Sequence, residues 1–408
     1  MLALYIDPGT GSMLFSIVIG LVATATFGIR ALAIKIKYGF SKEKIDASSD
    51  SIPYVIFSDH KRYWNVFEGI CRDFDKKGID ITYYTLSPDD PALACGLKHV
   101  HAEYLGEGNK PYTKLNFLKA DILIATTPNL NVYQWKRSKN VKCYVHIPHT
   151  VDDLSGYRMF GLDHYDVVLT TGSNQNDTIR ELEKLRPSIK RKELVTVGSP
   201  TLDHLSEELK KTGNRPSDKK PTILVAPSWG KSGILSRYGE KLLQSLSNTD
   251  FNVIVRPHPQ TVVSEKEILN PLKEKFSNLE WNFDNDNFEV LNRADLLITD
   301  FSGIIFDYAL VFDKPLIYAD TDFNTLPYDA DWLDKEYWSL RVLPKLGYKL
   351  DEKSFADISS LIEKALHSSS LEKGREEIRS ICWKNQSNST NASSEYLIRK
   401  REYLLKTK

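Results

Sequence analysis

Residues 295–318, with the sequence DLLITDFSGIIFDYALVFDKPLIY, limit most strongly which folds this chain can adopt. The apolar run at 296–298 has the length and composition of a buried strand. Ser302 follows where a helix can begin, because serine is a favoured N-cap, and apolar residues then recur at helical spacing up to Phe312. Asp-Lys-Pro at 313–315 is expected to end the helix, and a second strand follows. A strand–helix–strand unit predicts a parallel sheet.

The same alternation of apolar strands and helical segments runs through most of the chain. Strands are predicted in two groups, which lie before and after residue 213: 53–58, 79–84, 120–126, 141–146, 166–171 and 194–197, then 222–226, 251–255, 278–283, 295–299 and 315–318. This alternation predicts two doubly wound, Rossmann-like α/β domains. The polar stretch KKTGNRPSDKKP at 210–221 is the expected linker between them. The predicted domains are therefore 51–213 and 214–380, preceded by an N-terminal segment at 1–50 and followed by a helical tail at 381–408.

The N-terminal segment predicts a membrane anchor. Residues 8–29 contain no charged side chain, and the first 29 residues contain no Lys or Arg, so the basic n-region of a signal peptide is missing. A spanning helix needs roughly 20 apolar residues, and a buried helix is the alternative interpretation. Five basic residues between Arg30 and Lys44 would place the following domains in the cytoplasm. We expect a single-pass protein of the cell membrane.

The composition excludes some other classes. Acidic and basic residues balance at 54 each, so the basic excess typical of a nucleic-acid-binding protein is absent. The four cysteines have no Cys-x-x-Cys spacing, which favours reduced thiols over a disulfide framework or a zinc site. We expect no bound metal.

Three strand ends in the second half carry groups suited to phosphate. Arg256 directly follows the strand at 251–255, and His258 lies between Pro257 and Pro259. Arg offers a planar fork for phosphate oxygens. The loop APSWGKSG at 226–233 supplies glycine N–H groups and Lys231, which can surround a diphosphate. Ser302 and Gly303 open a helix whose free N–H groups suit a phosphate.

A histidine-rich strand end in the first half can carry acid–base chemistry. The sequence YVHIPHT at 144–150 contains His146 and His149. A histidine near its reference pKa of about 6.5 can accept a proton at neutral pH. Either histidine is a candidate.

These motifs resemble those of the CDP-glycerol glycerophosphotransferases. The residues at 300–308, DFSGIIFDY, followed by KPLIY at 314–318, are similar to the family signature D-x-S-S-x-x-x-D-[YF] … K-P-x-x-Y. Gly303 replaces the second serine of that signature. The Arg-Pro-His-Pro sequence resembles the family's element beside the donor phosphates, and 226–229 resembles its A-P-T-W loop. His149-Thr150 is the best match to the family's His-Gly-Thr, although the glycine is absent.

The resemblance implies an enzyme of GT-B fold, with a cleft between its two domains and no cofactor. His149 and His258 would be catalytic. Donor or phosphate contacts would come from Ser228, Trp229, Lys231, Arg256, Asp300, Ser302, Gly303 and Asp307. The enzyme would move glycerol phosphate from CDP-glycerol to a hydroxyl of a lipid-linked acceptor at the membrane, in the synthesis of a teichoic-acid-like polymer, and would release CMP. Two alternatives stay open: a GT-B glycosyltransferase that uses a nucleotide sugar, and a non-catalytic membrane-bound scaffold.

Overall fold

A computed structural model describes residues 51–157, 161–213, 220–284, 286–319 and 336–407. The expected membrane helix lies within residues 1–50, outside the described residues. No helix among the described residues is long and apolar enough to cross a membrane.

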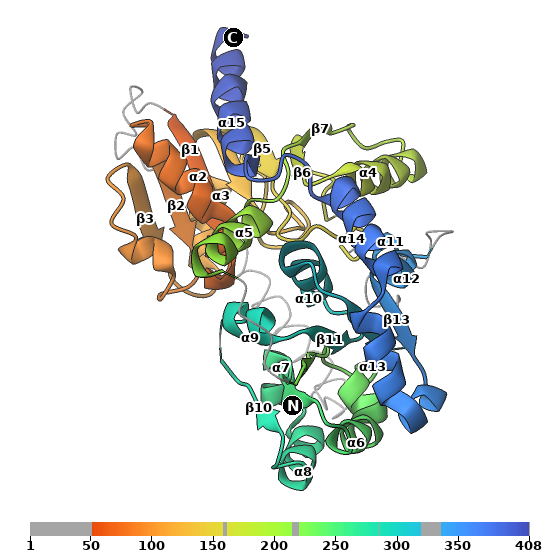
Figure 1. Cartoon of the computed structure of the whole chain (residues 1–408). Coiled ribbons are helices and arrows are strands. Elements are labelled where there is room, and N and C mark those ends of the chain that lie inside the picture. The colour runs from red at the N-terminus through yellow and green to blue at the C-terminus, as the bar shows by residue number, and fades with distance from the viewer. Residues whose placement is uncertain (1–50, 158–160, 214–219, 285, 320–335, 408) are drawn as a thin grey trace, which may run out of the picture. The chain divides into compact units, whose positions relative to one another are not determined.

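The first half contains a seven-stranded sheet in which every strand pair is parallel (Figure 1). The strand order is β3-β2-β1-β4-β5-β6-β7. The strands are β1 (Ile52–Ser58), β2 (Ile81–Thr85), β3 (Val100–Tyr104), β4 (Ala120–Ala125), β5 (Val141–His146), β6 (Val167–Thr170) and β7 (Glu193–Thr196). The central strands are buried along their length, as expected of a parallel sheet covered by helices on both faces.

The second half contains a six-stranded parallel sheet with the order β10-β9-β8-β11-β12-β13. Its strands are β8 (Thr222–Val225), β9 (Asn252–Val255), β10 (Glu280–Trp281), β11 (Leu296–Thr299), β12 (Leu316–Ala319) and β13 (Gly347–Leu350). Two parallel α/β domains confirm the fold that the alternating pattern predicts.

Helices connect these strands. In the first half they are α2 (Trp64–Lys76), α3 (Lys110–Asn116), α4 (Ser173–Leu185) and α5 (Pro200–Thr212). In the second half they are α6 (Ile234–Ser247), α7 (Pro259–Ser264), α8 (Lys266–Lys275), α9 (Phe288–Arg293), α10 (Ile304–Phe306), α11 (Trp338–Arg341), α12 (Leu343–Leu346) and α13 (Ile358–Leu366). Helix α2 shows the periodicity clearly, because Val66, Phe67, Ile70, Cys71 and Phe74 are its buried residues.

The helix predicted after Ser302 differs in detail from the prediction. Gly303, rather than Ser302, is the N-cap of α10, and no side chain caps it. After one short turn the helix widens into the π-helix η3 (Asp307–Phe312). It ends at Asp313, which takes the left-handed conformation with φ 55°. The predicted end before Lys314-Pro315 is therefore correct, while the expected serine cap is wrong.

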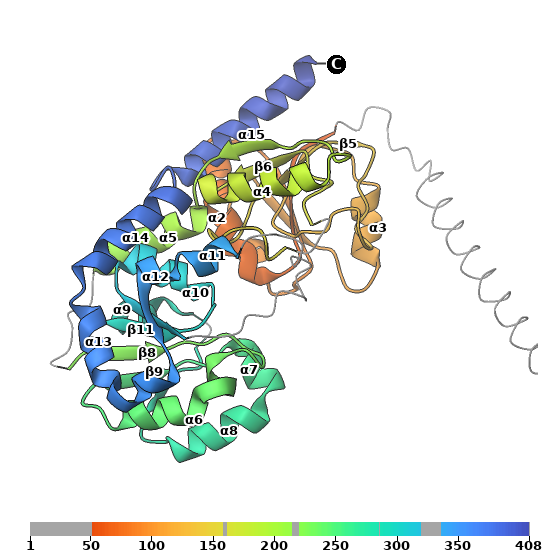
Figure 2. The same ribbon diagram turned by 90° about the vertical axis from the view of Figure 1, so that its right-hand side faces the viewer.

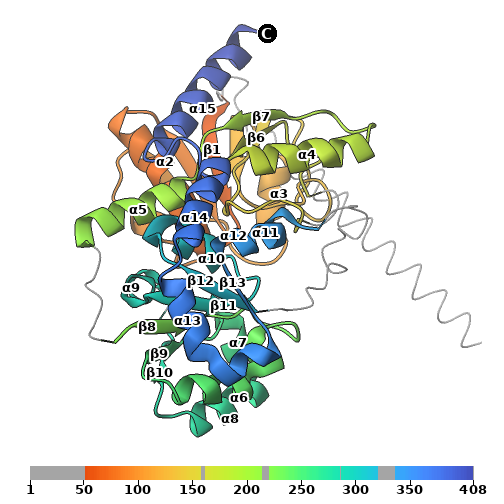
Figure 3. The same ribbon diagram turned by 45° about the vertical axis from the view of Figure 1, so that its right-hand side comes forward.

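After β13 the chain returns from the second sheet to the first. In Figures 2 and 3, α13, α14 (Ser369–Cys382) and α15 (Ser389–Lys406) follow one another along one side of both halves. Helix α15 packs on α2 and α5 of the first half. Gly198 makes the crossing possible, because a Cβ there would lie 2.0 Å from the carbonyl oxygen of Lys384, and its φ of +94° suits glycine.

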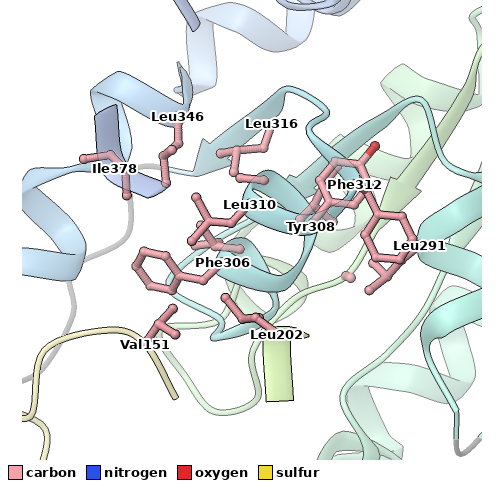
Figure 4. Close-up of a cluster of buried hydrophobic side chains, with 14 of the residues drawn as sticks. Val151, Leu202, Leu291, Phe306, Tyr308, Leu310, Phe312, Leu316, Leu346 and Ile378 are labelled. Carbon is pink, nitrogen blue, oxygen red and sulfur yellow. The ribbon is translucent and has the colours of Figure 1, made fainter. Parts of the chain in front are cut away.

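A shared hydrophobic core joins the two halves. Val151 and Leu202 of the first half pack in one buried cluster with Phe306, Leu310 and Ile378 (Figure 4). This cluster surrounds the helix that follows β11. The helical residues after Ser302 thus form part of the contact between the halves.

Candidate functional site

Three loops meet at one edge of the second sheet. Strands β9, β8 and β11 are neighbours in that order, and all are parallel, so their carboxyl ends share an edge. Residues 256–258, 226–233 and 300–303 follow these ends. We call them the three-loop edge. It brings together all the predicted phosphate-binding residues except Asp307.

Asp300 organises this edge from inside. Its carboxylate accepts hydrogen bonds from the backbone N–H of Ser228 at 2.9 Å, of Ile234 at 2.9 Å and of Phe301 at 2.8 Å. The side chain is buried, and burial raises its pKa, although the N–H donors of Ile234 and Ser228 oppose this shift. Asp300 therefore fixes the 226–233 loop, and its carboxylate is occupied by backbone donors.

Glu265 at the end of α7 holds the same loop from the other side. Its Oε1 accepts the N–H of Gly230 at 2.9 Å, and its Oε2 accepts the hydroxyl of Thr261 at 2.8 Å. With Asp300 and Glu265 fixing the backbone, Trp229 is left 53% exposed, and Lys231 is exposed and has no ion pair among the described residues. These two side chains are free to contact a ligand.

Arg256 and His258 are aimed by specific partners. The Arg256 guanidinium donates to the Asn282 side chain and to the carbonyl of Asp284. The Nδ1 atom of His258 accepts the N–H of Gln260 at 3.1 Å. In its neutral form His258 therefore carries its hydrogen on Nε2. Desolvation lowers the pKa of His258, while Asp300 and Glu265 act to raise it.

The two candidate histidines of the first half, His146 and His149, have different environments. His146 is fully buried, and its Nε2 lies 3.2 Å from the Tyr157 hydroxyl. Burial lowers its pKa to about 3, which fits a structural role. His149 is exposed at a concave surface, where its ring packs at 5.0 Å against Tyr63. Desolvation and the charge of Arg62 lower its pKa to about 4, so His149 is neutral at pH 7 and able to accept a proton.

Arg62 is a residue that the motifs did not indicate. Its positive charge lowers the pKa of both His149 and His258, which places it within electrostatic reach of each. It follows β1 in the sequence HKRY at 60–63. The basic residues just after the end of a predicted strand could have indicated Arg62 as a site residue.

Asp307 lies apart from the Asp300 network. It lines a cavity with His149, Asp152 and Gly303, while Asp300 is turned to the 226–233 loop. Although they are only seven residues apart in sequence, Asp300 and Asp307 therefore lie in different environments. Asp152 is a second residue at this cavity that the motifs did not indicate.

Two parallel α/β domains, with candidate phosphate-binding groups at strand ends of the second, are the arrangement of a GT-B-type fold. Residues 158–332 match the model of the family CDP-glycerol:poly(glycerophosphate) glycerophosphotransferase. The match confirms the resemblance that the motifs indicate, and the chain is an enzyme of the CDP-glycerol glycerophosphotransferase type. No curated protein sequence gives a significant match.

Solved structures show the same fold over almost the whole chain. The wall teichoic acid polymerase TagF is 15% identical, with a TM-score of 0.58 over 94% of this chain and 97% of that one. A TagF variant soaked with CDPG gives a TM-score of 0.59 at 15% identity, over 95% and 97% of the two chains. MnaA of S. aureus with UDP gives 0.56 at 13% identity, over 87% and 97%. At these identities the likeness concerns the fold alone.

Proposed function

We propose that this enzyme transfers glycerol phosphate from CDP-glycerol to a hydroxyl of a membrane-linked acceptor, in the synthesis of a teichoic-acid-like polymer. The observation that carries the proposal is the three-loop edge, which combines Arg256, His258 and a rigid glycine-containing loop within the family's matched region. It supplies the positive charges of Arg256 and Lys231 and the Nε2–H of His258, which suit a pyrophosphate.

In the proposed reaction, His149 takes the proton of the acceptor hydroxyl. The acceptor oxygen attacks the β-phosphorus of CDP-glycerol, and the bond from that phosphorus to the bridging oxygen breaks. CMP leaves with the bridging oxygen and its electron pair. Arg256 and the Nε2–H of His258 stabilise the charge that develops there. Such a transfer depends mainly on positioning and charge neutralisation.

Trp229 and Arg62 would complete the donor site. The exposed indole offers an apolar face on which the cytosine ring can stack. Arg62 would add a positive charge from the first half, close to both histidines.

A panel of donors tests the proposal. The full-length protein in detergent, with extracted membrane lipid as acceptor, is incubated in turn with CDP-glycerol, CDP-ribitol, UDP-sugars and GDP-sugars. CMP release with a CDP-polyol alone supports the proposal. UDP or GDP release with a sugar donor would instead support the glycosyltransferase alternative, and no release with any donor would leave the scaffold alternative.

We also propose that residues 1–50 anchor the enzyme in the cell membrane, with the remaining chain in the cytoplasm. The uncharged stretch at 8–29 and its basic flank support this proposal. A chain that starts at Ser51 is expected to move from the membrane fraction to the soluble fraction and to keep its binding of CDP-glycerol. Membrane association that is unchanged in this variant would contradict the anchor.

A further inference from the structure

A cavity of about 300 Å³ lies beside His149, between loops of the two halves. It is formed by the loop after β5, the start of α5 and the turn after β11. Its polar lining residues are His149, Thr150, Asp152, Ser199, Thr201 and Asp307. The cavity thus joins the proposed catalytic base to Gly303 at the three-loop edge.

The charge of this cavity differs from that of the three-loop edge. No Lys or Arg is among its described lining residues, whereas two carboxyl groups are. Burial raises the pKa of Asp307 to about 7, and burial together with the charges of Asp153 and Asp307 raises the pKa of Asp152 to about 7. A phosphate would meet no cation here and two acidic groups, so this cavity disfavours anions.

The Asp307 carboxyl has no hydrogen bond or ion pair with any of the described residues, although it is largely buried. Buried polar groups normally have partners. Hydroxyl groups of a ligand would supply them, since a carboxylate accepts hydrogen bonds from hydroxyls and a protonated carboxyl also donates one. Thr150 and Thr201 add further hydroxyl groups to the same cavity.

We propose that this cavity binds an uncharged, hydroxyl-rich part of the substrate, a polyol, and that Asp152 and Asp307 position it. The inference rests on the proposed function, because the polyol is placed next to the catalytic His149. The phosphates would then bind at the three-loop edge, and the polyol would bind in the cavity that Asp152 and Asp307 line. Asp307 then acts as a polyol contact rather than as a phosphate contact.

Such a polyol has two possible sources in this reaction. One is the glycerol of the donor, and the other is the terminal polyol of the acceptor chain. Both present neighbouring hydroxyl groups and both must come close to His149. Separate measurements on the donor and on the acceptor distinguish them.

The test uses the full-length protein with Asp307→Leu, Asp307→Asn, Asp152→Leu and Asp152→Asn. Leucine keeps the approximate size but removes the hydrogen bonds, while asparagine keeps them. Glu274→Gln, at an exposed position on α8, is the matched control. Calorimetry gives the Kd of CDP-glycerol and of CDP, which lacks the polyol, and steady-state CMP release gives kcat and the KM of the lipid acceptor.

If the donor glycerol occupies the cavity, the leucine variants raise the Kd of CDP-glycerol by roughly 10-fold to 100-fold and leave the Kd of CDP unchanged. If the acceptor occupies the cavity, the Kd values of CDP-glycerol and CDP stay the same. The KM of the lipid acceptor then rises by a similar factor, with a smaller change in kcat. In either case asparagine restores most of the loss. Unchanged CDP binding also shows that a variant is folded.

The proposal would be overturned if the leucine variants had the same Kd for CDP-glycerol, the same Kd for CDP and the same acceptor KM as Glu274→Gln. Equal weakening of CDP and CDP-glycerol would overturn it too, because that pattern means a role at the phosphates. Failure of the proposed function has a different signature: the wild-type protein itself would neither bind CDP-glycerol nor release CMP.

Discussion

The carboxylate of Asp300 accepts the backbone N–H of Ser228 at 2.9 Å across 72 positions of sequence. This bond ties the end of β11 to the loop after the neighbouring strand β8. It explains how a loop with two glycines can hold a fixed shape at the proposed phosphate site. The aspartate of the family signature therefore works here through the backbone of another loop.

Asp300→Ala is expected to loosen the three-loop edge. The change leaves the N–H groups of Ser228, Ile234 and Phe301 without their acceptor, and buried unpaired groups cost about 1–3 kcal/mol each. The free energy of unfolding should fall by about 3 kcal/mol in chemical denaturation, and CDP-glycerol should bind more weakly. Asp300→Asn keeps one oxygen acceptor, so its free energy of unfolding should lie between those of wild type and Asp300→Ala. An unchanged denaturation midpoint for the alanine variant would refute the role of the bond.

His258→Asn separates the helix cap from the proposed chemistry. Asparagine is a good N-cap and can still accept the Gln260 N–H, but it lacks the Nε2–H. We expect kcat for CMP release to fall by about 10²–10³-fold with unchanged stability. His258→Ala should lose both the cap and the activity. Full activity in the asparagine variant would exclude His258 from the reaction.

Arg62→Ala should raise the pKa of both His149 and His258. The positive charge of Arg62 disfavours their charged forms, so its removal favours protonation. NMR titration of the two imidazoles in the ligand-free protein measures this directly, with Lys373→Ala, which removes an exposed cation on α14, as a control. Titration curves that do not move would show that Arg62 is remote from both rings.

Asp203→Ala should weaken the attachment of the C-terminal helices. The buried carboxylate accepts the indole N–H of Trp383 at 2.8 Å and the backbone N–H groups of Ser387 and Ser389 at 2.9 and 2.8 Å. We expect a loss of about 3 kcal/mol in unfolding free energy. Asp177→Ala, at an exposed position on α4, should be neutral. Equal effects of the two substitutions would contradict this anchoring role.

Asp307→Asn should change how stability depends on pH. Because the folded state raises the pKa of Asp307 to about 7, the folded protein holds more protons than the unfolded one between about pH 4 and pH 7. Its contribution to stability is therefore lost as the pH rises through that window. Relative to wild type, the free energy of unfolding of the variant should rise by about 4 kcal/mol between pH 4 and pH 8, since the pKa of Asp307 is raised by about three units and each unit corresponds to about 1.4 kcal/mol. Parallel pH profiles of wild type and variant would disprove the raised pKa.

Apolar runs were enough to predict both sheets, since buried parallel strands such as β6 (VVLT) and β11 (LLIT) are almost wholly apolar. The edge strands β3 and β13 were missed. Strand β3 has the sequence VHAEY and is largely exposed, and β13 has the sequence GYKL, so neither carries a strong apolar signal. Strand ends and motifs together predicted the three-loop edge. Arg62 and Asp152 were not predicted, because their relation to His149 exists only after distant loops are brought together.

The fate of the β-phosphate is the most direct test of the proposed reaction. CDP-glycerol labelled with ³²P in the β-phosphate is incubated with the full-length protein and membrane lipid. Attack at phosphorus predicts that the label moves into the lipid fraction in a 1:1 ratio with released CMP, and that His258→Asn slows both by about 10²–10³-fold. Label that stays with the nucleotide as CDP, while glycerol enters the lipid, would mean attack at carbon and would contradict the phosphotransfer.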